Sequence, residues 1–174
     1  MAQVAIITAS DSGIGKECAL LLAQQGFDIG ITWHSDEEGA KDTAREVVSH
    51  GVRAEIVQLD LGNLPEGALA LEKLIQRLGR IDVLVNNAGA MTKAPFLDMA
   101  FDEWRKIFTV DVDGGFMLAN PQFKQEQCNG VSGYFNGYYF CRHDKTRKRR
   151  IRHGASGAGC GVNALSGLQV GHVW

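Results

Sequence analysis

A loop of small and hydroxyl-bearing residues at positions 8–15 (Thr-Ala-Ser-Asp-Ser-Gly-Ile-Gly) is the first segment whose composition suggests chemistry. It follows an apolar run that predicts a strand over 4–8 and precedes a pattern that predicts a helix over 13–25. Small residues let a backbone approach a pyrophosphate, and the first turn of a helix offers free N–H groups and a positive dipole. We interpret the loop as a dinucleotide-phosphate site; the alternative is a strand-to-helix turn that binds nothing.

The elements that must position this loop alternate in type along residues 1–118. Strands are predicted over 4–8, 27–33, 53–59 and 81–85, and helices over 13–25, 36–49, from Asn63 and Pro65 through Leu78, and over 101–118. This order indicates parallel βαβ units with right-handed crossovers. The nearly continuous apolar strands imply a sheet covered on both faces, and an arbitrary α+β domain is the alternative. In the last helix, the expected inward-facing residues are Trp104, Ile107, Phe108 and Val112.

Two further motifs carry a family resemblance. Asp60-Leu61 ends the third predicted strand, and Asn86-Asn87-Ala88-Gly89 ends the fourth. Together with the 8–15 loop and the helix opening Phe101-Asp102-Glu103-Trp104, they make residues 2–118 resemble the short-chain dehydrogenase/reductase family. The resemblance implies a three-layer α/β fold of the Rossmann type, with a doubly wound parallel sheet and an NAD(P)(H) cofactor across the carboxyl ends of its strands.

The same resemblance implies a role for each motif. Ser10, Ser12 and Ile14 would face the phosphates and ribose, Asp60 would meet the adenine amino group, and Leu61 would pack near the ring. Asn87, Ala88 and Gly89 would line the adenosine ribose and the nicotinamide side. The expected cofactor-binding residues are therefore Thr8, Ser10, Ser12, Gly13, Ile14, Gly15, His34, Asp60, Leu61, Asn87, Ala88 and Gly89.

Two departures from the family pattern concern the cofactor. Ala9 stands where the family usually has its first glycine, and its methyl group is expected to require a negative φ. The segment Thr32-Trp33-His34-Ser35 offers no carboxylate at the end of the second strand, where NAD-preferring members place one. With His34 and Lys16 nearby, we expect NADP(H) to be favoured over NAD(H); an exposed loop histidine is the alternative interpretation of His34.

A third departure concerns catalysis. Asp111 occupies the position of the family's Asn, which helps to hold a proton-relay water; we favour the alternative of a helix-surface carboxylate. The family also needs a Tyr-x-x-x-Lys pair with an upstream Ser, and the sequence contains none, because Tyr134, Tyr138 and Tyr139 are followed at that offset by Tyr, Arg and His. A guanidinium does not reproduce the lysine. No catalytic set is therefore expected to be intact.

Residues 119–174 form a second segment of different character. Residues 1–114 carry 10 basic and 18 acidic side chains, a net of −8, whereas residues 115–174 carry 8 and 2, a net of +6. One interpretation is a nucleic-acid-binding appendage over 145–152. Another is a metal site, but the spacing of Cys141, His143, His153 and Cys160 fits no zinc pattern, so no metal is expected. The interpretation we prefer is a reading-frame shift or gene disruption near 113–115, which leaves an incomplete fold and an irregular basic, Gly-rich tail.

These observations give the expected function and setting. The chain resembles an NAD(P)(H)-dependent oxidoreductase that acts on a small carbonyl or alcohol. One alternative is an inactive fragment that still binds the cofactor. The other alternative is a nucleic-acid binder, which we do not favour. No run of 18 apolar residues and no export signal is found, so no membrane contact and a cytoplasmic location with free thiols are expected.

A hairpin could form around Asn136-Gly137. We also expect self-association through an uncovered fourth strand and the helix that begins near Phe101.

Overall fold

The computed structural model describes residues 2–119, 128–135 and 138–141, the last two segments in their backbone only. All of them belong to one compact unit, Met1–Asp144; a second unit, Lys145–Trp174, lies outside the described residues. The predicted division at residue 118 therefore stays a prediction.

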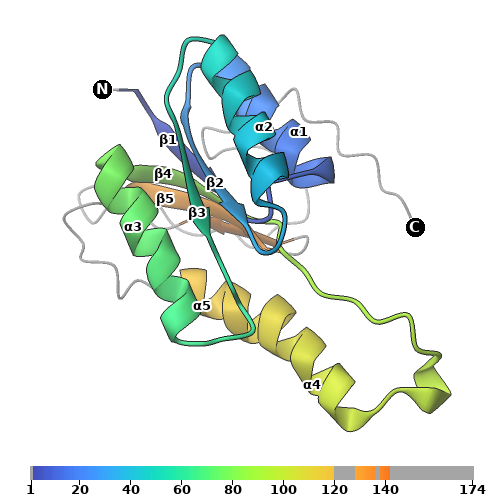
Figure 1. Ribbon diagram of the computed structural model, residues 1–174. Helices are drawn as coiled ribbons and strands as arrows, with labels where there is room; N and C mark the ends of the chain where they lie inside the picture. The colour runs from blue at the N-terminus through green and yellow to red at the C-terminus, as the bar shows by residue number, and fades with distance from the viewer. Residues whose placement is uncertain (1, 120–127, 136–137, 142–174) are drawn as a thin grey trace. The chain divides into compact units, whose positions relative to one another are not determined.

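The first unit is built around one six-stranded sheet (Figure 1). Its elements are β1 (Val4–Ile7), α1 (Gly13–Gln24), β2 (Asp28–Trp33), α2 (Glu37–Ser49), β3 (Ala54–Gln58), η1 (Glu66–Ala68), α3 (Leu69–Leu78), β4 (Ile81–Asn86), η2 (Phe96–Asp98), α4 (Phe101–Phe108), η3 (Thr109–Gly114), α5 (Gly115–Ala119), β5 (Cys128–Phe135) and β6 (Tyr138–Cys141). The strand order is β3-β2-β1-β4-β5-β6, and all neighbours are parallel except β5 and β6. The predicted Rossmann-type order is confirmed.

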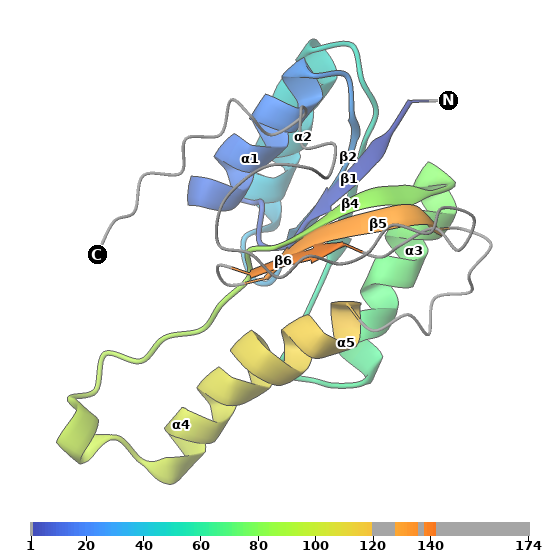
Figure 2. The same cartoon turned by 180° about the vertical axis from the view of Figure 1, so that it is seen from behind.

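Helices cover both faces of this sheet. Helices α1 and α2 pack on one face, and α3 and α5 lie on the other (Figures 1 and 2). Strand β1 is completely buried between them, as its unbroken apolar sequence Val-Ala-Ile-Ile requires. On the α3 side the core includes Ile6, Leu71, Leu74, Ile75 and Leu118, and burial of each such side chain contributes about 1.5–3 kcal/mol. The α3 residues Leu71, Leu74, Ile75 and Leu78, spaced at i, i+3, i+4 and i+7, thus form a buried stripe.

Buried carboxylates fix the amino-terminal ends of the strands. Asp28 opens β2 and accepts three hydrogen bonds from Arg53, from its backbone N at 2.8 Å and from Nε and Nη2 at 3.0 and 2.8 Å. Asp82 in β4 accepts the N–H of Val4 at 2.8 Å and pairs with Arg80. Charge-assisted bonds of this kind join β2 to the start of β3 and β1 to β4, at the strand ends opposite to the predicted cofactor loop.

Strand β4 is not the sheet edge that the sequence suggested. It pairs in parallel with β5, from Ile81 with Cys128 to Asn86 with Phe135, across one register shift, and Figure 2 shows the two strands side by side. Strands β5 and β6 then pair antiparallel on either side of residues 136–137. The predicted hairpin is confirmed, while the expected uncovered fourth strand is wrong, because a strand that follows a non-periodic polar segment fills that place. The segment after 118 is therefore not wholly irregular.

The helix predicted over 101–118 is continuous but not uniform. Its middle, Thr109–Gly114, is a π-helical segment between α4 and α5, a local widening that is common at functional sites. The expected inward positions are wrong in α4 and η3: Trp104 and Phe108 of α4 are 37% and 38% exposed, Val112 of η3 is 45% exposed, and Ile107 is half-buried. The physical reason is that α4 runs away from the sheet (Figures 1 and 2), so its apolar stripe meets no core.

Candidate functional site

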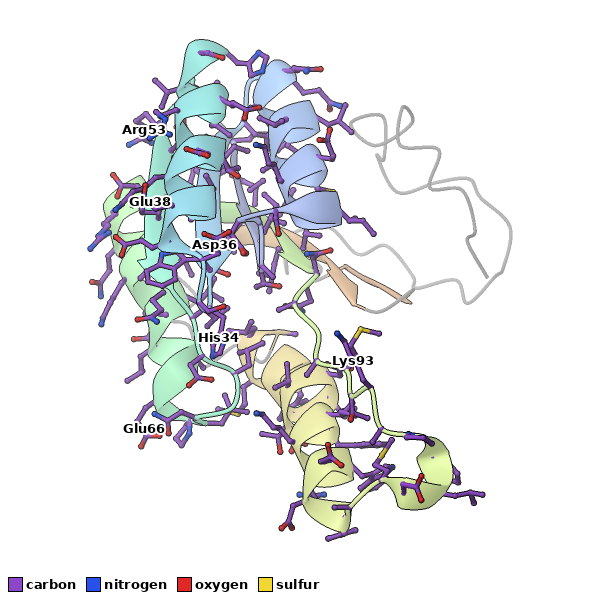
Figure 3. The ribbon with its side chains drawn as sticks, turned by 45° about the vertical axis from the view of Figure 1, so that its right-hand side comes forward. His34, Asp36, Glu38, Arg53, Glu66 and Lys93 are labelled. Carbon is purple, nitrogen blue, oxygen red and sulfur yellow. The ribbon has the colours of Figure 1, made fainter. Side chains whose placement is uncertain are left out.

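A cleft of about 770 Å³ lies at the carboxyl ends of the parallel strands. Of the predicted cofactor residues it brings together His34, Asp60, Leu61, Ala88 and Gly89, which follow β2, β3 and β4. Figure 3 shows His34 beside the end of β2 and Lys93 on the loop after β4. A volume of this size is typical of sites for small molecules and cofactors.

The cleft also includes residues that the sequence motifs did not single out. They come from the loop after β4 and from the helix that follows it, and they include Met91, Lys93, Lys106, Ile107 and Val110. Among them, the helical spacing of apolar residues singled out only Ile107, and that spacing predicted a side chain facing the core. A 3.6-residue period shows which side chains share a face but not whether that face meets a core or a cleft.

The first turn of α1 is open to a ligand. Ser12, Gly13 and Ile14 are exposed, and Ile14 has 80% of its surface free. Ser12 is the N-cap in an extended conformation and makes no side-chain capping bond. The first N–H groups of a helix have no partner within the helix, so this turn offers donors and a positive dipole to an anion.

Gly15 is needed for packing rather than for contact with a ligand. The residue is buried, and a Cβ atom there would lie 2.2 Å from the carbonyl oxygen of Ala9 and 2.6 Å from Nδ2 of Asn87. Both distances are far shorter than any non-bonded contact that a Cβ atom makes. Only glycine therefore lets α1 approach the end of β1 this closely.

Ala9 adopts a positive φ of 50°, so the expected negative φ is wrong. Its N–H donates to Oγ1 of Thr32 at 3.0 Å, and its carbonyl accepts from Nδ2 of Asn87 at 3.0 Å. A left-handed conformation costs an alanine about 1–2 kcal/mol. The two hydrogen bonds from neighbouring strand ends hold the loop in that conformation, which local sequence rules could not show.

Thr8 and Asn87 join the end of β1 to the end of β4. The Thr8 hydroxyl is buried and accepts the N–H groups of Asn87 and Ala88 at 2.9 and 2.8 Å. Asn87 Nδ2 in turn donates to the carbonyls of Thr8 and Ala9, both at 3.0 Å. We call Thr8, Ala9, Gly15, Asn87 and Ala88 the β1–β4 seam. Ser10 beside it is also buried, and its hydroxyl donates to the carbonyl of Ile7 at 2.8 Å.

The opposite side of the cleft is exposed and charged. His34 Nε2 lies 3.6 Å from Oδ1 of Asp60, and the two side chains are 69% and 51% exposed. The same Asp60 oxygen accepts the N–H of Gly62 at 2.8 Å. Leu61 next to it is buried. Lys16 is held elsewhere, because its Nζ donates to Glu46 Oε1 at 2.6 Å, a bond that raises the pKa of the lysine.

Asp111 tethers the loop after β4 to the π-helical segment. Its Oδ1 accepts the N–H of Ala90 at 2.7 Å, and a Cβ atom on Gly89 would lie 3.5 Å from that oxygen. The carboxylate is half-buried. The favoured interpretation of Asp111 as a helix-surface carboxylate does not hold, because the side chain reaches across to the N–H of Ala90, which lines the cleft.

Several predictions fall on residues whose side chains are not described. Among them are Tyr134, Tyr138, Tyr139 and Cys141, described in their backbone only, and His143, His153, Cys160 and the basic run 145–152, which lie outside the described residues. Within the described residues, no group of three or more His, Cys, Asp or Glu side chains could hold a metal ion. In that same part of the chain no helix combines the length and the apolar character needed to cross a membrane.

The fold and the loop chemistry agree with a comparison to known families. The chain belongs to the short chain dehydrogenase family, whose family model matches residues 3–131. The match runs past residue 118, where the sequence motifs end, into β5. These are oxidoreductases that use NAD(P), and the predicted family and fold are confirmed.

Individual relatives are similar over the same region. An uncharacterized oxidoreductase, YohF, of Escherichia coli strain K12 is 89% identical over 133 residues, which cover 76% of this chain and 53% of that protein. The crystal structure of acetoin dehydrogenase YohF from Salmonella typhimurium is 72% identical with a TM-score of 0.66, covering 68% of this chain and 47% of that one.

A more distant solved structure includes a cofactor. A blue fluorescent protein from a metagenomic library, in complex with NADPH, is 31% identical with a TM-score of 0.63, covering 67% of this chain and 48% of that one. The chain spans about half the length of the curated relatives that it matches.

Proposed function

We propose that this chain binds NAD(P)(H) across the carboxyl ends of β1–β4, with NADP(H) favoured. The observation that carries the proposal is the open first turn of α1 at the same edge of the sheet as the cleft. A helix N-terminus beside a glycine-containing turn binds a pyrophosphate through its N–H groups. The NADPH bound by a family member at 31% identity supports the same choice of ligand.

The predicted binding residues divide into two groups in this proposal. Ser12, Gly13 and Ile14 are exposed and would contact the phosphates and ribose. Asp60, Leu61, Ala88 and Gly89 would enclose the adenosine and the nicotinamide side, and His34 would meet a 2′-phosphate. Thr8, Ser10, Gly15 and Asn87 are buried or bonded within the protein; they would shape the loop and offer backbone groups rather than side chains.

We propose that the chain binds cofactor without efficient turnover. The cofactor would supply the hydride, but the family's general acid needs a Tyr-x-x-x-Lys pair, which the sequence lacks. A fluorescence titration of the full chain with NADPH and NADH tests binding, and the expected result is saturable binding that is tighter for NADPH. Failure to bind either nucleotide would refute the proposal, and equal or tighter binding of NADH would refute the preference.

An active enzyme is the second candidate. A relative at 72% identity is described as an acetoin dehydrogenase, which favours a small hydroxyketone or diketone as the substrate of an active form. The test is NADPH oxidation with diacetyl and acetoin against a control without protein. Steady oxidation above that control would support the enzyme and exclude the binding-only form. A cytoplasmic location and the absence of nucleic-acid binding remain predictions.

Self-association through α4 is also part of the proposal. The exposed stripe on this helix consists of Phe101, Trp104 and Phe108; the ring centroids of Phe101 and Trp104, which are stacked, lie 5.8 Å apart, and those of Trp104 and Phe108, which are tilted, lie 4.1 Å apart. Phe101 is 70% exposed, and a contiguous apolar patch of this kind favours protein contacts. We expect a dimer or larger species in sedimentation velocity; a monodisperse monomer at tens of micromolar would contradict it.

A further inference from the structure

The π-helical segment Thr109–Gly114 contacts two walls of the cleft. Its Asp111 accepts the N–H of Ala90, which lines the cleft on the loop after β4. Its last residue, Gly114, is buried and lies against Leu61, which lines the cleft after β3. A local widening of this kind is common at functional sites. The segment therefore bears on the shape of the cleft at two separate points.

Gly114 approaches Leu61 more closely than a residue with a side chain could. A Cβ atom on Gly114 would lie 3.1 Å from both Cβ and Cδ1 of Leu61 and 3.3 Å from its Cγ. These separations are tighter than nine in ten contacts that real Cβ atoms make, so a neighbour would have to shift. Within a helix alanine is intrinsically preferred to glycine. Glycine therefore provides space at this position rather than backbone freedom.

The side chain of Leu61 is enclosed by the core but faces the cleft. It is only 5% exposed, and it belongs to the buried cluster that also contains Leu59, Ala68 and Leu118. A protein core is packed almost without spare volume, whereas the cleft is open. A methyl group on Gly114 would therefore displace Leu61 toward the cleft rather than into the core.

We propose that Gly114 is a positioning residue for nucleotide binding, because the room that it leaves for Leu61 sets the space in which the adenine ring packs. This inference rests on the proposed function, in which Leu61 helps to enclose the adenosine. NADPH and NADH have the same adenine ring, so the effect is common to both nucleotides. It is steric, so it does not depend on salt, unlike an effect between exposed charges.

The test measures nucleotide affinities of the full-length Gly114→Ala variant by fluorescence titration. We expect its Kd for NADPH and for NADH to rise by a similar factor of about three to ten, because an extra methyl group in a packed site is costly. ADP, used as a competitor of NADPH, should weaken by a similar factor, since it contains the adenine but no nicotinamide.

ADP also decides where the methyl group acts. A loss of affinity for NADPH without a loss for ADP would overturn the proposal, because the methyl group would then act at the nicotinamide side. Failure of ADP to compete with NADPH for the parent chain would overturn it as well, because the adenine would not contribute to binding.

A double-variant cycle shows whether Gly114 acts through Leu61. Leu61→Ala removes the Cγ and Cδ1 atoms that the new methyl group would meet. In that background we expect Gly114→Ala to change the Kd for NADPH by less than about twofold, which is the non-additivity of residues in contact. Leu61→Val removes less of the side chain and should give a smaller reduction of the effect. An effect of Gly114→Ala that is as large in both backgrounds as in the parent chain would refute the proposal.

A matched control adds a similar volume away from Leu61. Val112→Ile adds one methylene group to the same π-helical segment, at a position that is 45% exposed and is not among the residues lining the cleft. It should leave the affinities for NADPH, NADH and ADP unchanged. A loss of affinity in this variant equal to that in Gly114→Ala would show that any enlargement of the segment weakens binding, which contradicts a specific role of Gly114.

The fold of each variant is checked by far-UV circular dichroism and denaturant unfolding. If Gly114→Ala alone does not fold, the comparison of Leu61→Ala with the double variant decides, because the double variant has room for the methyl group. Equal affinities of those two for NADPH are expected, and a much weaker double variant would refute the proposal.

The outcomes also separate this inference from the proposed function. If the parent chain binds neither NADPH nor NADH, both fail. If the parent chain binds NADPH and Gly114→Ala folds with unchanged affinities, only the role of Gly114 is refuted.

Discussion

The β1–β4 seam and the helix α4 both contain apolar or small residues, yet they differ in burial: the seam residues are buried or half-buried, whereas every residue of α4 except Ile107 is exposed. In the seam, Thr8 and Asn87 make a closed set of hydrogen bonds between two strand ends. In α4, the rings of Phe101, Trp104 and Phe108 lie against one another, and among the described residues all three stay exposed. The difference teaches that the strand ends beside the cleft are joined by their own hydrogen bonds, whereas the helix beside them has a face that the described residues do not cover.

The largest expected effect breaks the seam sterically. Gly15→Ala would place a methyl group 2.2 Å from the Ala9 carbonyl, so we expect a loss of about 3 kcal/mol or more in the free energy of unfolding. Denaturant unfolding measures it. Gly13→Ala is the matched control, because Gly13 has a φ of +54° but open space around its Cβ, and it should cost only about 1–2 kcal/mol. Equal losses in the two variants would contradict a packing role.

Removal of the seam's central hydroxyl should have the next effect. Thr8→Val keeps the shape but leaves the Ala88 N–H without its acceptor and the Asn87 N–H with only the Val85 carbonyl at 3.0 Å, which should cost about 2–3 kcal/mol. Thr43→Val is the control, since Thr43 is equally buried but its hydroxyl donates to the Gly39 carbonyl within α2, and it should cost about 1 kcal/mol. Denaturant unfolding measures both losses, and an equal loss in the free energy of unfolding for the two variants would contradict a special role of the Thr8 hydroxyl.

Asp111 in η3, just after α4, bonds to Ala90 on the loop that follows the seam, and its variants separate charge from hydrogen bonding. Asp111→Ala removes the acceptor for the Ala90 N–H and should cost about 1–2 kcal/mol. It should also weaken NADPH binding, because the loop after β4 loses its tether. Asp111→Asn keeps an acceptor oxygen and should retain most of the stability and affinity. Titration and thermal unfolding measure both, and an Asn variant as weak as the Ala variant would show that the charge itself matters.

Ala9→Gly should strengthen the seam slightly. The positive φ of Ala9 costs about 1–2 kcal/mol, whereas glycine adopts it freely but loses more backbone entropy on folding. The expected net change is a gain of up to about 1 kcal/mol in the free energy of unfolding. A loss of stability would mean that the methyl group contributes packing that exceeds the strain.

The smallest effect on stability is expected in α4. Phe101→Ala removes a side chain that is 70% exposed, so the cost should stay within about 0.5 kcal/mol. Its effect should fall on association: sedimentation velocity should show less of the larger species than for the parent chain. A large loss of stability without any change in association would reverse the contrast between α4 and the seam.

Local patterns predicted the elements and the position of the cleft well. Apolar runs of strand length, the α3 stripe and the small residues after β1 each depend on interactions between near neighbours in sequence. The open turn at Ser12 to Ile14 follows directly from the strand-loop-helix order. The same local rules could not predict the positive φ of Ala9 or the bond from Asp111 to Ala90, because both depend on groups more than 20 residues away.

The sequence by itself determined the parallel βαβ order, the phosphate-type loop and the absence of a Tyr-x-x-x-Lys pair, since each is a property of residue type and spacing. Only the tertiary structure decided that β5 covers β4, that α4 turns its apolar stripe outward, and that Asp60 lies against His34. The physical reason is that periodicity defines a face or a strand end, while burial and charge contacts depend on which distant element packs there.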